Sequence, residues 1–182
     1  MALLFQSNPD QWDLRRYLKP GGKVSWFVNR YLDEMKTGVL TLLWEAQGTK
    51  SKLIRGLYGW GITLAEATPD EQGLLRIPLQ YVERWICAED AKKGVLEAEQ
   101  NAGIQAKDVL TLESWHDHLL NKMAIGTNFK ILPLQLKELS SLVSKKYPES
   151  KFPEAVRLQN EGIPLNVNKF KNQYLREAND DK

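Results

Sequence analysis

The chain has 182 residues, 42% of them hydrophobic and 26% charged, which is typical of a globular protein and excludes a disordered or membrane-embedded one. The first ten residues lack the basic start and apolar core of a signal peptide, and no segment approaches the roughly 20 apolar residues that span a bilayer. Cys87 is the only cysteine, which excludes an internal disulfide and suits a reducing compartment. We therefore expect a cytoplasmic protein with no membrane partner.

The net charge is only +2, but it is unevenly distributed along the chain. Lys and Arg outnumber Asp and Glu by 9 to 5 in residues 1–60 and by 11 to 7 in residues 119–182, whereas residues 61–118 have 5 basic and 11 acidic side chains. The basic outer parts could fold into one positive face, as in phosphate-binding proteins. Charge differences of this size also arise by chance.

The first half of the chain is rich in predicted strands. ALLFQ predicts a strand, and the SNPDQW that follows it predicts a helix start, with Asn8 as the cap and Pro9 in the first turn. Further strands are predicted in KVSWFVNRY, VLTLLWEAQG, SKLIRGLYGWGITLAEA and GLLRIPLQYVERW, with one helical turn at LDEMKTG. Pro78 in the last of these favours a sheet edge or a bulge.

The second half is mainly helical. DVLTLESWHDHLLNKM and PLQLKELSSLVSKKY have apolar residues at helical spacing, and GTNFKIL between them predicts a late strand. We expect residues 1–147 to form one domain and the polar segment 148–182 to be a loosely packed appendage or linker. About six strands, mostly before residue 86, with helices around them predict an α+β fold, a small bent sheet or partial barrel flanked by helices.

No pattern in the sequence favours catalysis. His116 and His118 are two residues apart, so on a helix they point in different directions and do not converge on a metal. Cys87 has no local partner, and the glycines of RGLYGWG do not have the spacing of a phosphate-binding loop. We therefore expect no enzymatic activity, no bound metal and no cofactor.

Aromatic, amide and basic residues gather in the stretch VSWFVNRYLDEMKTG. Strand alternation places Trp26 and Arg30 on one side and Asn29 on the other. With Trp44 and Trp60 on neighbouring strands, these residues could form a pocket for a flat ring taken out of its stack. The alternative is that the tryptophans simply fill the core.

Four segments occur in the order SWFVNRYLDEMKTG, VLTLLWEAQ, IRGLYGWGIT and GTNFKIL. Together, over about residues 1–146, they resemble the EVE domain, a PUA-like module related in fold to the YTH readers of methylated adenosine. The family has a strand Trp, an Asn/Arg pair, a Met-Lys-x-Gly-Asp turn, an apolar strand ending in an aromatic residue, a G-x-G strand and a G-x-N-F segment. Val39 stands where the family has Asp, which puts the hydrogen bonding of that turn in doubt.

The resemblance implies a reader that flips a modified base into an aromatic cage, often a modified cytosine in DNA such as 5-methylcytosine or 5-hydroxymethylcytosine. It also implies double-stranded DNA as the partner and, in some members, a fused or associated nuclease of a modification-dependent restriction system. Asn29 would contact the base edge or the backbone. The base-binding candidates are Trp26, Asn29, Tyr31, Trp44, Trp60 and Asn128, and the phosphate-contact candidates are Arg30, Lys52 and Arg55.

Two other functions compete with this hypothesis. A PUA-like module can instead bind structured or modified RNA, which the 2′-hydroxyl distinguishes from DNA. A protein-interaction domain whose aromatic residues are all core would show no salt-dependent binding of nucleic acid. The sequence does not identify the modification that would be read.

Overall fold

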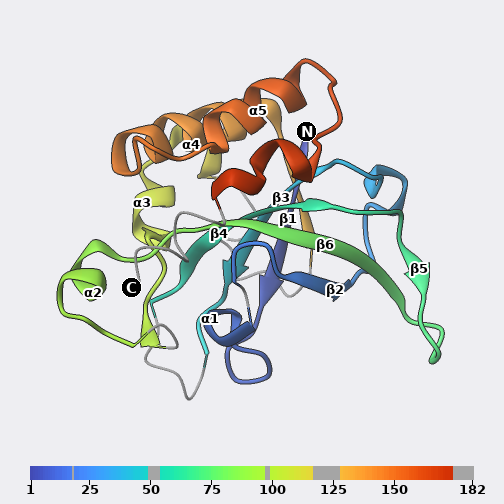
Figure 1. The fold of residues 1–182 in the computed structure, drawn as a ribbon, viewed down its shortest axis with the longest axis horizontal. Coiled ribbons are helices and arrows are strands. Elements are labelled where there is room, and N and C mark those ends of the chain that lie inside the picture. The colour runs from blue at the N-terminus through green and yellow to red at the C-terminus, as the bar shows by residue number, and fades with distance from the viewer. Residues whose placement is uncertain (18, 49–53, 97–98, 117–127, 174–182) are drawn as a thin grey trace.

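The computed structural model describes residues 1–17, 19–48, 54–96, 99–116 and 128–173 (Figure 1). The strands are β1 (Ala2–Ser7), β2 (Lys23–Phe27), β3 (Leu40–Glu45), β4 (Gly56–Thr63), β5 (Thr68–Pro69), β6 (Leu75–Arg84), β7 (Ile104–Gln105) and β8 (Asn128–Ile131). The α-helices are α1 (Leu14–Tyr17), α2 (Ala88–Lys92), α3 (Ala106–Leu110), α4 (Pro133–Lys146) and α5 (Phe152–Asn160). Three short 3-10 helices are η1 (Leu32–Glu34), η3 (Glu113–Trp115) and η5 (Val167–Gln173).

Six strands form the body of one sheet in the order β2-β6-β4-β3-β1-β8, with β5 paired to β6 and β7 to β4. Among the strands of the described residues, only β1 and β3 are parallel neighbours. The sheet curls so that the end strand β2 approaches β1, the strand next to the other end: Phe5 on β1 contacts Trp26 on β2, with 5.5 Å between ring centroids. The predicted α+β fold, a bent partial barrel flanked by helices, is confirmed.

The two faces of the sheet bury different cores. We call one the helix-side core, because α4, α5 and η5 cover it; its largest members are Trp44, Trp60, Trp85, Trp115, Phe129 and Phe152. These helices lie together above the sheet in Figure 1. The other is the seam-side core, which fills the inside of the curl and includes Leu3, Phe5, Leu14, Trp26, Met35, Tyr58 and Tyr81.

The segment after residue 147 is not loosely packed, contrary to our expectation. Phe152, Val156, Leu165 and Phe170 are buried in the helix-side core, and α5 packs on α4. Aromatic and aliphatic residues spaced along a polar sequence thus cover the sheet, because each apolar side chain points inward while its neighbours face solvent. In the part described, residues 148–173 share the core of the preceding domain.

Three local predictions were also wrong. Residues 8–12 form a turn and α1 begins only at Leu14, since the Asn8 side chain accepts from the Asp10 amide instead of capping a helix. The helix predicted from residue 108 stops at Leu110, and residues 117–127 lie outside the described part. Pro78 is not at an edge, because β6 lies between β2 and β4. Its carbonyl accepts from the Leu64 amide, just after the end of β4, so proline's lack of an N–H leaves no β4 residue without a partner there.

The turn in which Val39 replaces the family's Asp is bonded by another residue. Thr63 Oγ1 accepts from the Val39 amide at 2.8 Å, and the Thr63 carbonyl accepts from the Gly38 amide at 2.9 Å. Gly38 has φ +80°, and a Cβ there would lie 2.9 Å from the Leu165 backbone, so glycine is required twice over. The hydrogen bonding of the turn is therefore supplied by β4.

Candidate functional site

A cavity of about 510 Å³ opens where the curled sheet fails to close, between the end of β1 and the edge strand β2. We call it the seam cavity. Its volume lies within the range of about 300–1,000 Å³ that small-ligand sites occupy. Its lining residues are Gln6, Ser7, Asn8, Gln11, Trp12, Ser25, Trp26, Phe27 and Arg76.

Two tryptophans give the seam cavity its aromatic wall. The Trp12 and Trp26 rings are 4.9 Å apart and meet edge to face at 68°, and Trp26 rests on Phe5 behind it. Trp26 is only 5% exposed, whereas Trp12 is half-buried. The rigid, buried ring of Trp26 therefore holds a more accessible ring at the cavity mouth.

The loop that carries Trp12 is tightly anchored. The Asn8 carbonyl accepts from the amides of Gln11 and Trp12 at 3.0 and 2.8 Å, and Ser7 Oγ donates to the Trp12 carbonyl. At the far end of the loop, Glu45 Oε2 accepts from the Leu14 amide at 2.9 Å. The strand and the loop thus fix the Trp12 ring through main-chain contacts, independently of any ligand.

The edge strand offers main-chain groups to the same space. The Val28 amide donates to the Leu75 carbonyl, and the Gly22 carbonyl accepts from the Tyr81 amide, so the even-numbered residues along β2 point their main-chain N–H and C=O groups toward β6. In an antiparallel pair the alternate residues point their N–H and C=O groups the other way. Within the described residues β2 pairs with β6 only, so Ser25 and Phe27, which line the cavity, turn donors and acceptors toward it.

Arg76 is the cation of the seam cavity. Its Nε donates to Asp70 Oδ2 at 2.6 Å, and this contact holds the pKa of the Asp70 carboxyl below its usual range. Asp70 also accepts from the amides of Gln72 and Leu74, so it ties the β5–β6 turn to the arginine. The guanidinium is thereby fixed at the cavity rim with donors to spare.

Trp44 and Trp60 do not lie with Trp26. Both are buried in the helix-side core, on the opposite face of the sheet, and the Trp60 indole donates to Glu83 Oε2 at 2.9 Å. Their rings pack against the helices; Trp60, for example, meets Phe170 edge to face at 5.2 Å. The structure therefore does not bring the three predicted cage tryptophans together. The prediction failed because strand alternation shows which residues share a face of one strand, but not which face of the sheet that is.

Asn128 acts as a brace between β8 and the end of β2. It is fully buried; its Nδ2 donates to the Arg30 carbonyl at 2.6 Å, and its Oδ1 accepts from the Asn29 amide at 3.4 Å. These bonds support Tyr31, which adopts a left-handed conformation with φ 58° and packs on the seam-side core. Asn29, Tyr31 and Asn128 do not line the seam cavity but stabilise the turn beside it.

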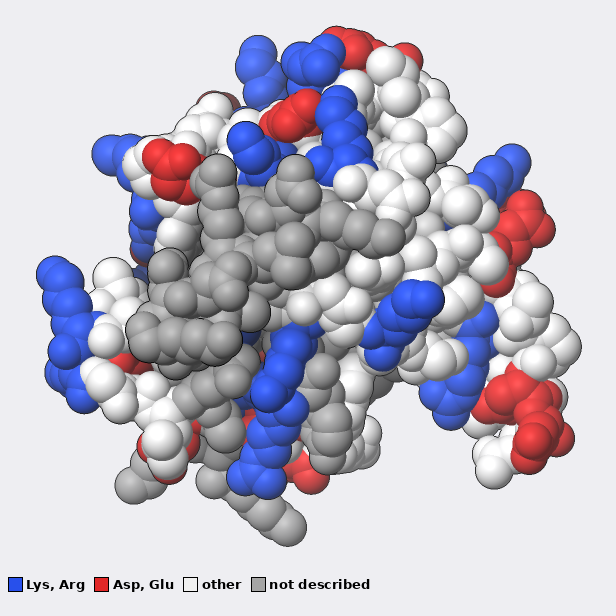
Figure 2. Space-filling view, viewed as in Figure 1, with Lys and Arg blue, Asp and Glu red and all other residues white. Residues whose placement is uncertain are grey.

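The predicted phosphate contacts are scattered. Arg30 is exposed at the turn after β2, the Arg55 guanidinium lies 5.7 Å from the Trp44 ring, and Lys52 lies outside the described residues. On the face shown in Figure 2, the described basic side chains are spread over the outline and the middle of the face, and acidic side chains lie between several of them. The predicted single positive face is not seen among the described residues of this view.

Sequence analysis missed most of the cavity lining. Trp12 was assigned to a helix and Asn8 to its cap, and none of Gln6, Asn8, Gln11, Ser25 and Arg76 was named as a binding residue. The available signal was the run SNPDQW directly after a buried strand, since turn residues next to an aromatic often mark a functional loop. Arg76 had no such signal, because it is 64 positions away from Trp12 and meets the cavity only through the curl of the sheet.

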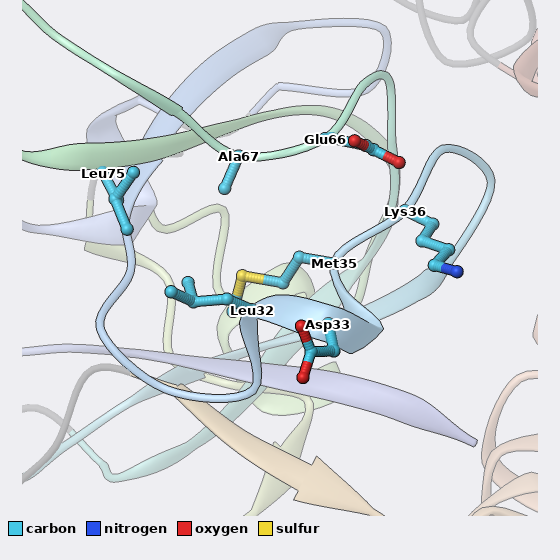
Figure 3. A pocket seen from close by; sticks show the side chains of 7 residues that line it. All are labelled: Leu32, Asp33, Met35, Lys36, Glu66, Ala67 and Leu75. Carbon is cyan, nitrogen blue, oxygen red and sulfur yellow. The ribbon is translucent and has the colours of Figure 1, made fainter.

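A second cavity, of about 350 Å³, lies beside η1. Figure 3 shows the side chains of Met35, Leu32, Leu75 and Ala67 facing a common space, whereas Lys36 and Glu66 extend away from it at one rim. No group of polar atoms converges there among the described lining residues. The seam cavity, with aromatic, amide and cationic groups together, is the better candidate for a ligand site.

The described part of the chain contains no group of three or more His, Cys, Asp or Glu side chains placed to hold a metal. Within the same residues, no helix combines the length and the apolar character needed to cross a membrane.

Comparison with solved structures defines the class of fold. The DUF55 domain of human thymocyte nuclear protein 1 superimposes with a TM-score of 0.53 over 82% of this chain and 100% of that one, at 13% identity. A hypothetical protein from Leishmania major gives a TM-score of 0.55 over 80% of this chain and 95% of that chain, at 10% identity.

Human THYN1 in complex with DNA containing 5-methylcytosine matches with a TM-score of 0.51 over 82% of this chain and 99% of that chain, at 12% identity. No protein-family model matches the sequence, and no curated protein matches it significantly. This chain therefore has the fold of the EVE-type DUF55 domain, as the sequence resemblance implied.

Proposed function

We propose that this protein reads a modified base in DNA, most directly a modified cytosine, by taking it out of the stack into the seam cavity. The observation that carries the proposal is the cavity itself: two tryptophans, three amide side chains and an arginine converge at an unpaired strand edge. A protein of the same fold, human THYN1, has been crystallised with DNA that contains 5-methylcytosine. The role proposed is recognition, not catalysis.

The aromatic wall suits the flat face of a base. Stacking on an aromatic side chain contributes roughly 1–3 kcal/mol per base and offsets the few kcal/mol needed to unstack and unpair the nucleotide. Trp12, the more accessible ring, would cover the base, and Trp26 would hold Trp12 in place. In this proposal Trp44 and Trp60 are no longer cage residues.

The polar wall suits the edge of a base. Cytosine presents an amino donor and ring acceptors, and the outward-facing main chain of Ser25 and Phe27 presents the complementary groups at a fixed spacing. Asn8 and Gln11 are exposed side chains on the opposite wall and can adjust to a substituent. Asn29 and Tyr31, beside the cavity, are proposed to contact the flanking backbone, with Asn128 holding them there.

Phosphate groups on either side of a flipped nucleotide need cations near the cavity. Arg76 lies on its rim, and Arg30 is exposed on the turn that Asn128 braces. Arg55 and Lys52 are proposed to extend this contact along the duplex. Such contacts give affinity that falls with salt but carry no sequence information.

The test is fluorescence anisotropy with four matched duplexes that differ at one position: cytosine, 5-methylcytosine, 5-hydroxymethylcytosine or N6-methyladenine. The wild type is expected to prefer one modified duplex at both low and high salt. Equal, salt-sensitive binding to all four would contradict base reading, and stronger binding to a matched RNA would move the function to RNA. Absence of binding would favour a protein-interaction role.

The chain supplies recognition alone in this proposal. Any nuclease of a modification-dependent restriction system would be a separate domain or protein that acts on the DNA recognised here. Adding the protein to modified and unmodified duplexes with Mg²⁺ is expected to leave both uncut. Cleavage that survived further purification would contradict the non-catalytic role.

A further inference from the structure

Glu45 is a buried carboxylate at the foot of the seam cavity, although it does not line it. It ends β3, faces Ser7 across the parallel pair of β1 and β3, and has no exposed surface. Oε2 accepts from the Leu14 amide, while Oε1 has no hydrogen-bond partner among the described residues. Burying a carboxylate with one unpaired oxygen destabilises the fold relative to an apolar residue at the same position. A role for this carboxylate therefore has to be sought in the contact that it makes.

We propose that Glu45 is a positioning residue for the seam cavity, holding the 8–13 loop in the conformation that presents Trp12 and Asn8. This inference rests on the proposed function for its consequence in base reading. Its structural part, the control of the loop, can be measured on the protein alone.

The contacts form a continuous path from Glu45 to the cavity. The Leu14 amide is fixed by the Glu45 carboxylate, and the Leu14 side chain is buried in the seam-side core. The opposite end of the loop is fixed by Ser7, the neighbour of Glu45 across the strands, through its bond to the Trp12 carbonyl. Both ends of the loop are therefore clamped at one rung of the sheet.

The charges around Glu45 decide how firmly it holds. Burial raises the pKa of Glu45 to about 7, and the nearby Asp13 carboxylate acts in the same direction, whereas the Leu14 amide and Arg15 oppose the rise. Tyr58 faces it from β4, and the Glu45 charge helps to raise the pKa of that phenol. Arg15 is engaged with Asp13 by two side-chain bonds and so compensates Glu45 only in part.

Glu45 therefore changes charge near neutral pH. The ionised form accepts a charge-assisted hydrogen bond from Leu14, which is stronger than the bond of the neutral acid. Burial of the charge outweighs this gain, because it raises the pKa of Glu45 in the closed loop, so ionisation favours opening of the loop. The loop should accordingly be held less firmly above pH 7 than below it, and discrimination between bases should follow. Non-specific affinity for DNA depends on surface cations and should not change over this pH range.

The first test is hydrogen exchange of the free protein. In E45A the amides of residues 8–14 should exchange about ten-fold faster, as expected for losing one hydrogen bond to a charged group. E45Q keeps an acceptor and should change exchange less than three-fold, by the same reasoning. E161Q is the matched control, because it neutralises an exposed carboxylate on the helix side, away from the 8–13 loop. Unchanged exchange of residues 8–14 in a folded E45A protein would overturn the inference.

The second test separates the inference from the proposed function. The ratio of dissociation constants for unmodified and 5-methylcytosine duplexes is measured from pH 6 to pH 8 for wild type and E45Q. The wild-type ratio should fall as the pH rises, with a midpoint near 7, and the E45Q ratio should stay flat. A flat ratio in both proteins would overturn the pH control. A ratio of one throughout, with faster exchange in E45A, would reject the base reader but keep Glu45 as the loop anchor.

Discussion

The two faces of the sheet use tryptophan in opposite ways. On the helix-side core, Trp60 and Trp85 are fully enclosed, and both indoles donate to the same carboxylate, Glu83. At the seam, Trp12 is half-buried and meets Trp26 at the wall of a cavity. The enclosed rings have all their surface committed to the protein, whereas the seam rings retain surface for a ligand. Residue type alone does not distinguish a structural tryptophan from one that can bind a ligand. What distinguishes them here is whether helices cover that face of the sheet.

The largest effect is expected on the enclosed face. Trp60→Ala should lower the free energy of unfolding by roughly 3–5 kcal/mol, because it leaves a cavity and removes a donor from buried Glu83. Urea unfolding measures this. Trp12→Ala, at the half-buried seam ring, is the matched comparison and should cost clearly less. Equal losses for both variants would show that the seam ring is as structural as the enclosed one.

The next effect is a pH dependence at the foot of the seam. The pKa of Glu45 is about 7 in the folded protein and 4.5 is its ordinary value. As the pH rises, the unfolded chain therefore loses this proton at a lower pH than the folded protein does. Its contribution to stability is complete below pH 4.5 and is lost as the pH rises to 7, by at most about 3 kcal/mol.

This pH effect can be isolated with Glu45→Gln. The difference in unfolding free energy between wild type and variant should move in favour of the variant between pH 4.5 and pH 7.5, while other carboxyl groups cancel. Urea titrations at four pH values would measure it. A difference that stays constant over this range would mean that Glu45 is ionised throughout.

At the cavity wall, Trp26→Ala should remove most of the preference for a modified duplex while leaving weak, salt-sensitive binding. The expected loss is up to about 1–3 kcal/mol of discrimination, the contribution of stacking on Trp12, because Trp12 loses the ring that holds it in place. Anisotropy against modified and unmodified duplexes measures it, with circular dichroism to confirm folding, since Trp26 also packs on Phe5. Retained preference in the folded variant would place the reading site elsewhere.

The sequence predicted most of the strands and the curled α+β fold, since strand alternation and turn residues are local signals. It also named Trp26, which lines the seam cavity, as a candidate, because its strand and motif were both clear. It could not place Trp12, because β1 and β2 are not neighbours in the sheet and only the curl brings the 8–12 loop against β2. Nor could it assign Trp44 and Trp60 to a face, since that depends on which side the C-terminal helices cover.

A smaller effect is expected at the brace beside the cavity. Asn128→Ala removes the bond from a fully buried side chain to the Arg30 carbonyl and should cost about 1–2 kcal/mol of stability, because that part-buried carbonyl loses its donor. Asn168→Ala, at an exposed position of η5, is the control and should cost less than about 0.5 kcal/mol. Thermal unfolding of the two variants checks the expectation, and equal shifts would contradict the bracing role.

The smallest effect is expected from the surface cation. Arg30→Ala should weaken binding to modified and unmodified duplexes by the same factor and reduce the slope of log affinity against log salt by about one. Arg157→Ala, on α5 and paired with Glu161, should leave the slope unchanged. A change in base preference in the Arg30 variant would instead make this residue part of the reading site.

The proposed reading of a modified base requires that the base leaves the duplex and enters the seam cavity. The most direct measurement places the fluorescent base 2-aminopurine next to 5-methylcytosine in a duplex and follows its emission as wild-type protein is added. Emission should rise to saturation, because the neighbour loses its stacking partner, and Trp12→Ala or Trp26→Ala should greatly reduce the rise. Saturated binding with no change in emission would show that the base stays in the stack and that the seam cavity does not receive it.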